Sequence, residues 1–131
     1  MGKNKYSVEF EIRASSKMLF PYISTPSGLA QWFAEDVNLS TEKVYDFIWD
    51  GSSHYAVQSN QRINKFVRFD FLEDDKNPSE DPSFIEFRLD LNELTQSSFL
   101  RITDYSDVES EEDVVIMWTS LVAALKEIVG G

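Results

Sequence analysis

TPSGLAQWF, residues 25–33, is the stretch that decides how this chain is interpreted. Thr25 can cap a helix that begins at Pro26, because proline is favoured in the first helical turn. The apolar side chains that follow share one helical face, at i, i+3 and i+4: Leu29, Trp32 and Phe33. The stretch therefore predicts the second of two short helices within residues 16–33.

The segment before it predicts the first helix of the pair. Ser15 or Ser16 offers a hydroxyl for the N-cap of this helix. Pro21 lies about one turn inside, so the helix must be short or kinked. Its apolar stripe consists of Met18, Leu19, Tyr22 and Ile23.

A long amphipathic helix is predicted at the other end of the sequence, over residues 111–129. Ser110 followed by Asp113 resembles a capping box, and Glu111 and Glu112 complement the helix dipole. The expected apolar stripe consists of Val114, Trp118, Leu121, Leu125 and Ile128, widened by Val115, Val122 and Val129.

Most of the chain outside these helices alternates apolar and polar residues, which is typical of half-buried strands. Asp50-Gly51 is a strong hairpin signal. In the segment after it, the apolar positions are Tyr55 and Val57. The predicted strands are Tyr6–Ile12, Val37–Leu39, Val44–Trp49, His54–Asn60, Phe66–Leu72, Ile85–Leu91 and Phe99–Tyr105.

Composition limits the classes of function. The 131 residues are 42% hydrophobic and 14% aromatic, as expected of one globular domain over residues 1–131. A net charge of −11 disfavours nucleic acid and anionic membranes as partners, and leaves a basic protein as a possible one. The absence of cysteine excludes disulfides and thiolate nucleophiles. With no signal sequence and no apolar run of about 18 residues, we expect a cytoplasmic protein with no membrane span.

An acidic segment over residues 73–82 predicts a polar loop between two strands, because its prolines and acids suit no core. Four of its carboxylates are oxygen ligands of the kind that calcium takes, but their spacing does not match an EF-hand loop. We expect a solvated loop and no metal. The four carboxylates belong to Asp74, Asp75, Glu80 and Asp81.

Candidates for catalysis are few. His54 is the only histidine, and its place just after a hairpin signal favours a solvated turn residue over a general base. Arg101 shares a strand face with Phe99 and Tyr105, where it could anchor a carboxylate ligand. Because Leu100 and Ile102 compete for the inner face, we expect Arg101 on the outer face.

The whole sequence resembles the START-like superfamily, also called SRPBCC, helix-grip or Bet v 1-like, and within it the homologues of the activator of heat-shock-protein ATPase. The resemblance is carried by strand 6–14, helix 15–24, the stretch 25–33 and the closing residues 118–125. It implies a curved sheet that grips the last helix, a fold that often encloses an apolar cavity. The superfamily includes lipid carriers, cyclases and cochaperone domains. The cochaperone contact surfaces do not map onto this chain, and the acidic loop has no counterpart, so a cochaperone role is not implied.

The sequence therefore predicts an α+β fold: an antiparallel sheet of about seven strands around a long C-terminal helix, with two short helices after the first strand. We expect a binding protein rather than an enzyme, without cofactor, that holds a small hydrophobic ligand between the sheet and the last helix. The alternative is a protein-interaction module whose acidic surface docks a basic partner. A cyclase or hydrolase ranks third, because no pairing of a histidine with an acid is expected inside the strands. The residues expected to line the cavity are Trp32, Phe47, Trp49, Tyr55, Phe69, Phe71, Phe87, Met117, Trp118 and Leu121.

Overall fold

A computed structural model describes residues 2–75, 77–108 and 110–131. Its centre is one seven-stranded sheet in the order β1-β7-β6-β5-β4-β3-β2, and all neighbouring strands are antiparallel. The chain thus runs back and forth across the sheet from β2 to β7, and β1 joins at the far edge. The strands are β1 (Asn4–Ile12), β2 (Asp36–Leu39), β3 (Val44–Trp49), β4 (Ser52–Arg62), β5 (Phe66–Phe71), β6 (Phe84–Asn92) and β7 (Ser97–Ser106).

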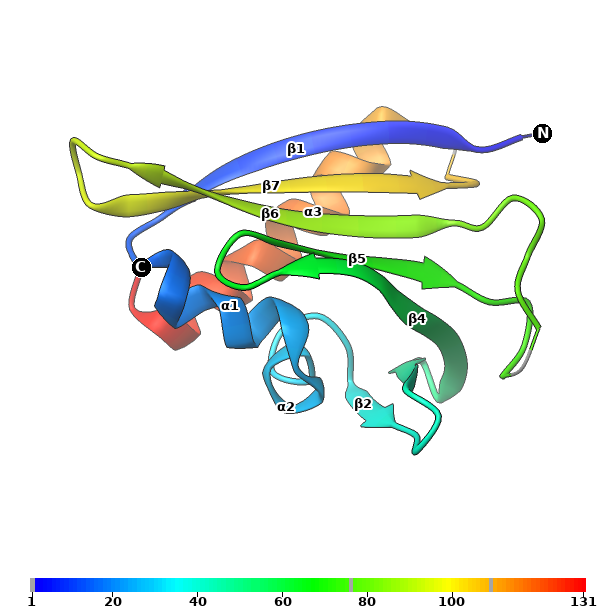
Figure 1. Ribbon diagram of the computed structural model, residues 1–131. Helices are drawn as coiled ribbons and strands as arrows, with labels where there is room; N and C mark the ends of the chain where they lie inside the picture. The colour runs from blue at the N-terminus through cyan, green and yellow to red at the C-terminus, as the bar shows by residue number, and fades with distance from the viewer. Residues whose placement is uncertain (1, 76, 109) are drawn as a thin grey trace.

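In the described part of the chain, three helices lie on the sheet. The long helix α3 (Glu111–Val129) crosses behind β1, β7 and β6, and the short helices α1 (Ser16–Ser24) and α2 (Pro26–Leu29) lie together below β5 (Figure 1). The predicted α+β fold, a curved antiparallel sheet with a C-terminal helix and two short helices after the first strand, is confirmed. The described helices include none that is both long enough and apolar enough to cross a bilayer.

Local signals explain where the helices begin. The Ser15 hydroxyl accepts a hydrogen bond from the Met18 amide at 3.0 Å, and the Ser110 hydroxyl accepts one from the Asp113 amide at 3.3 Å. Thr25 caps α2 in the same way, through a 3.0 Å bond from the Gly28 amide. The prediction of helix as far as Phe33 was wrong, because α2 ends at Leu29 and residues 30–33 form turns.

The buried stripe of α3 differs in part from the predicted one. Val122 is fully buried, whereas Leu121 is half-buried and Ile128 is 38% exposed. Each residue advances about 100° around a helix, so Leu121 and Ile128 both rotate to one side of the line that faces the sheet. The residues on that line are Val114, Trp118, Val122 and Leu125.

The inner face of the sheet, which α3 covers, supplies most of the core. Phe47, Phe69 and Phe87 are almost completely buried there. In β4 the inner position is Ala56, which pairs with Tyr45 and Phe71. The prediction that Tyr55 faces inward was therefore wrong by one residue. Large aromatic rings on both neighbouring strands leave room only for a small side chain between them.

Tyr45 ties this sheet to the end of α1. Its hydroxyl donates a hydrogen bond of 2.9 Å to the backbone oxygen of Ser24, and the Gln58 amide lies 3.4 Å from the same hydroxyl. Burial raises the pKa of the Tyr45 phenol above its usual value. These hydrogen bonds thus hold β3, β4 and the end of α1 together beside the core.

Candidate functional site: an aromatic cavity beneath helix α3

A partly open cavity of about 740 Å³ lies between the sheet and α3. Its volume is within the range of about 300–1,000 Å³ that is usual for small-molecule sites. Its walls come from β3, β4, β5, β6, β7 and α3, together with Phe33 from the turn after α2. The lining residues are Phe33, Trp49, Asp50, Ser53, His54, Tyr55, Phe71, Leu72, Glu73, Asp74, Ser83, Phe84, Ile85, Asp104, Tyr105, Ser106, Val108, Met117, Trp118 and Leu121.

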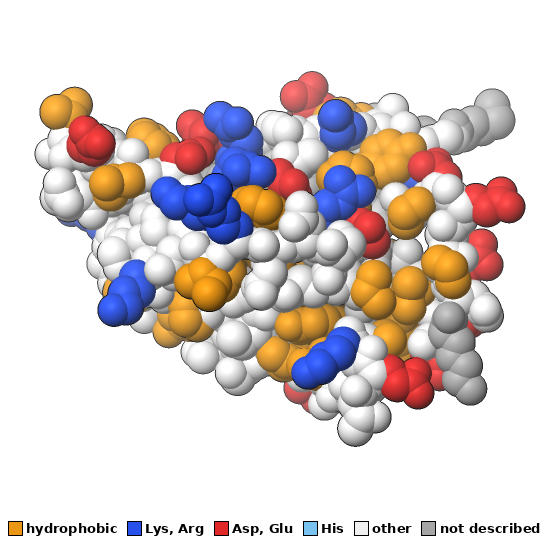
Figure 2. Space-filling model, viewed as in Figure 1, with side chains coloured by type: hydrophobic (Ala, Val, Ile, Leu, Met, Phe, Trp, Pro, Cys, Tyr) orange, Lys and Arg blue, Asp and Glu red, His pale blue; other side chains and the backbone are white. Residues whose placement is uncertain are grey.

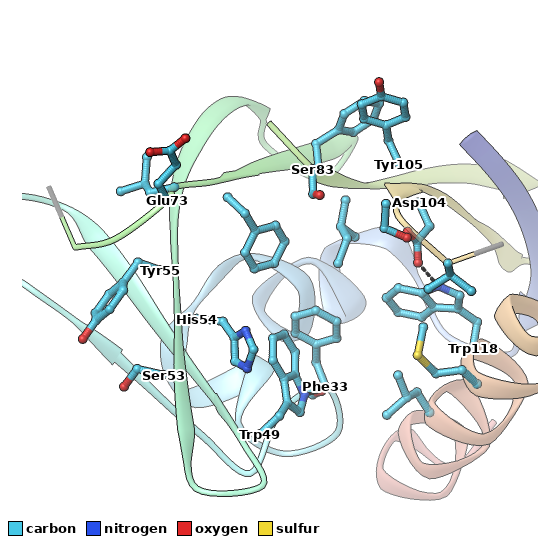
Figure 3. A pocket seen from close by; sticks show the side chains of 18 of the residues that line it. Phe33, Trp49, Ser53, His54, Tyr55, Glu73, Ser83, Asp104, Tyr105 and Trp118 are labelled. Atoms are coloured by element: carbon cyan, nitrogen blue, oxygen red, sulfur yellow. Dashed lines mark hydrogen bonds between the residues drawn. The ribbon is translucent and has the colours of Figure 1, made fainter. Parts of the chain in front are cut away.

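One wall is built on Trp118. Its side chain is fully buried, and its indole Nε1–H donates a 2.8 Å hydrogen bond to Oδ2 of Asp104 (Figure 3). The ring of Phe33 stacks on the indole at 5.7 Å, and Phe87 meets it edge-on at 5.8 Å. Packing on both sides therefore fixes the orientation of this wall.

The opposite wall is built on Trp49. The Trp49 indole donates a 2.8 Å hydrogen bond to the backbone oxygen of Phe33, and its ring meets the Phe33 ring edge-on at 5.1 Å. The imidazole of His54 lies 5.1 Å from the Trp49 ring. In the close-up, His54 and Trp49 lie on the side of the cavity away from Asp104 and Trp118 (Figure 3).

Asp104 is the buried acidic residue in the wall. It is only 4% exposed and lies on the inner face of β7, opposite Tyr6 of β1. Asp104 was not among the residues predicted to line the cavity. The signal was present in the sequence, because the alternation that buries Leu100 and Ile102 also turns Asp104 inward.

The cavity brings together six of the ten residues expected to line it, and five do so with inward-facing side chains. The sixth, Tyr55, has its ring turned away from the cavity (Figure 3), because it pairs with Asp46 on the outer face of the sheet. The five are Trp49, Phe71, Met117, Trp118 and Leu121. The other four lie in the packed core instead: Trp32, Phe47, Phe69 and Phe87.

Two of these core residues have clear packing roles. Trp32 donates a hydrogen bond of 2.8 Å from its indole to the backbone oxygen of Tyr22, and so holds the turn after α2 against α1. Phe47 packs between Phe33 and Phe69. Sequence periodicity predicted their inward direction but could not separate a filled part of the interior from an open part.

His54 and Arg101, the other two candidate residues, lie on different faces of the sheet. His54 lies within β4 rather than in a turn, and its exposed side chain borders the cavity. Arg101 is exposed on the outer face, where its guanidinium lies 3.3 Å from the Glu9 carboxylate, as expected. No lysine or arginine occurs among the described residues that line the cavity.

Two carboxylates of the acidic loop accept hydrogen bonds from other residues of the chain. The Asp74 carboxylate accepts hydrogen bonds from the Asn77 backbone amide and side chain, and the Asp81 carboxylate accepts one from the Tyr105 hydroxyl at 2.9 Å. Asp81 also raises the pKa of the Tyr105 phenol. Within residues 2–75, 77–108 and 110–131, no group of acids or histidine is arranged to hold a metal ion.

Comparison with known proteins identifies the family. The model of the START-like superfamily domain matches residues 1–131, and the chain belongs to that superfamily. A solved structure from Bacteroides fragilis is 32% identical, with a TM-score of 0.63, and the match covers 98% of this chain and 93% of that one.

Two further structures have the same fold at lower identity. The solution structure of the Aha1 dimer from Colwellia psychrerythraea is 18% identical, with a TM-score of 0.71, and the match covers 95% of this chain and 94% of that one. A crystal structure from Mesorhizobium loti is 14% identical, with a TM-score of 0.75 and coverage of 97% of both chains. At these identities, the two similarities show only that the fold is shared. A comparison with curated proteins found no match.

Proposed function

We propose that this protein binds a small hydrophobic molecule in the cavity between the sheet and α3, without catalysis. The observation that carries the proposal is the cavity of about 740 Å³ with aromatic walls. Rings such as Phe33 and Trp118 are held rigidly there by stacking and hydrogen bonding. A rigid apolar cavity binds an apolar ligand at low entropic cost. Membership of a superfamily whose members often bind hydrophobic ligands supports the same function.

The arrangement of the polar groups favours binding over catalysis. A general acid and base must both come within hydrogen-bond reach of one reacting group. His54 borders one side of the cavity, and Asp104 lies on the other, bonded to Trp118 (Figure 3). This separation supports a non-enzymatic role for the one histidine of the chain.

The interaction-module alternative has less support. On the face shown in Figure 2, Lys and Arg side chains are spread over much of the surface, and acidic side chains lie among them and along the right side. Some charges of the protein also pair with one another, as in Arg68 with Asp70 and Arg101 with Glu9. A face of mixed and paired charges does not attract a basic protein strongly.

A single domain and a cytoplasmic location remain predictions from composition.

Native mass spectrometry of the protein purified from its host tests the proposal first. We expect a bound molecule that is lost under denaturing conditions. A second test uses the neutral dye Nile red, whose emission rises when it enters an apolar site. Leu121→Trp places a larger side chain into the cavity wall, and we expect it to weaken dye binding by about tenfold or more.

The matched control is Ile116→Trp on the same helix. Ile116 is 57% exposed and does not line the cavity, so this change adds the same side chain outside it. We expect dye binding as in the wild type. A protein that carries no molecule and binds no dye, or equal losses in both variants, would contradict the proposal.

A further inference from the structure

The wall of the cavity contains one buried carboxylate among the described residues, that of Asp104. Asp104 is 4% exposed, and it accepts a hydrogen bond of 2.8 Å from the neutral indole N–H of Trp118. In the described part of the chain, the salt bridges join other residues and none involves Asp104. A buried charge is costly unless a charge of opposite sign or several hydrogen bonds compensate it. A positively charged group of a bound ligand would therefore compensate the charge of Asp104 at this site.

A second polar atom in the wall has no hydrogen-bond partner among the described residues. This atom is the hydroxyl oxygen of Ser106, which is buried and forms no hydrogen bond within residues 2–75, 77–108 and 110–131. Ser106 and Asp104 are two residues apart on β7, so their side chains lie on the same face of the sheet, and both line the cavity. A buried hydroxyl without a hydrogen-bond partner is uncommon and calls for an explanation. A ligand group with several donors would satisfy both residues.

The rim has the same sign of charge as the wall. Asp50, Glu73 and Asp74 border the opening, and no lysine or arginine is found among the described lining residues. The Glu73 side chain points away from the aromatic walls (Figure 3), so it acts on a ligand through its field rather than by contact. Clefts lined by one sign of charge concentrate ligands of the opposite sign and repel those of the same sign.

We propose that the ligand of this cavity is an apolar molecule that ends in a protonated amine, with the ammonium group at Asp104 and Ser106. This inference rests on the proposed function and specifies the ligand class. An ammonium group has three donors and no acceptor, which matches a carboxylate beside an unpaired hydroxyl. A carboxylate ligand of the same size is excluded, because its charge would be buried beside that of Asp104.

Three probes with one apolar body test the proposal: decylamine, decanol and decanoate. Their binding is measured by isothermal titration calorimetry below the micelle concentration, and by the fluorescence of Trp49 and Trp118, which line the cavity. We expect decylamine to bind about tenfold or more tightly than decanol, and decanoate to bind least. Decanol or decanoate binding as tightly as decylamine would overturn the amine assignment while the proposed function stands. No binding of any probe would overturn both.

Asp104→Asn removes the charge and keeps an oxygen that accepts from Trp118. We expect it to lower the affinity for decylamine by about tenfold and to leave decanol within about twofold. Asp90→Asn is the control, since Asp90 is exposed on the outer face of β6 and outside the cavity. Both variants lose one negative charge, so equal losses in the two would show non-specific attraction to an acidic protein and would overturn the assignment. A thermal melt confirms folding, and the comparison among probes on the wild type holds independently of both variants.

Discussion

At the scale of the residue, Trp118 links separate parts of the molecule. It belongs to α3, its indole N–H bonds to Asp104 of β7, and its ring stacks on Phe33 from the turn after α2. The side chain is fully buried, so these contacts are made away from water. The same residue therefore supports the core and forms one wall of the cavity.

Replacing Trp118 should separate its packing from its hydrogen bond. Trp118→Ala removes a large buried ring, and we expect a loss of about 3–5 kcal/mol in the free energy of unfolding. Trp118→Phe keeps most of the apolar volume but leaves the buried Asp104 carboxylate without its donor, for which we expect a loss of about 1–3 kcal/mol. Urea denaturation measures both. A loss below about 1 kcal/mol for Trp118→Ala would mean that α3 contributes little to the core.

At the scale of the element, the close approach of α1 and α2 positions Phe33. Thr25 joins the two helices, because its hydroxyl donates to the Pro21 oxygen at 2.7 Å and accepts from the Gly28 amide at 3.0 Å. A Cβ atom on Gly28 would lie 2.1 Å from the Pro21 oxygen. Only glycine permits this contact, and the contact sets where the chain leaves α2 toward Phe33.

Gly28→Ala should therefore push the two helices apart. The obstructing atoms are backbone, which cannot rotate away, so we expect a loss of about 1–3 kcal/mol in the free energy of unfolding. Because Phe33 moves with the helices, we also expect weaker binding of Nile red. The control is Ser27→Ala, at an exposed neighbour, which should leave stability within about 0.5 kcal/mol of the wild type. Equal stability of the two variants, measured by urea denaturation, would show that the helices separate at no cost.

At the scale of the whole molecule, Glu11 fastens the first strand to the last hairpin. Its carboxylate accepts hydrogen bonds from the side chains of Ser97, Thr95 and Asn92, at the β6–β7 end of the sheet. These bonds, that from Ser97 first, lower the pKa of Glu11 below its ordinary value of 4.5. A strand near the N-terminus is thus held to a hairpin some eighty residues away in sequence.

The lowered pKa of Glu11 predicts a pH dependence of stability. A depressed carboxyl pKa contributes stability that is fully present above the unfolded-state value and is lost as pH falls through the folded-state value. We expect Glu11→Gln to be less stable than the wild type at neutral pH, and the difference to shrink below pH 4.5. Thermal melts across pH measure the difference. Glu127→Gln, exposed on α3, removes the same charge without these bonds and serves as the control. A difference independent of pH would show that the carboxylate charge of Glu11 is not what matters.

The sequence by itself determined the elements and their order. Caps at Ser15, Thr25 and Ser110 and the alternation along the strands are local signals, set by hydrogen bonds and side-chain directions within a few residues. They were enough for the α+β fold and for the inward direction of residues such as Trp49 and Phe71.

Only the tertiary structure decided which part of the interior is filled and which is open. The inner position of β4 belongs to Ala56 rather than Tyr55, because rings from β3 and β5 close over it. Asp104 gains its importance from Trp118, which reaches it from another element. Contacts of this kind depend on how the sheet curves and where α3 crosses it, and the period of a single strand contains no information about either.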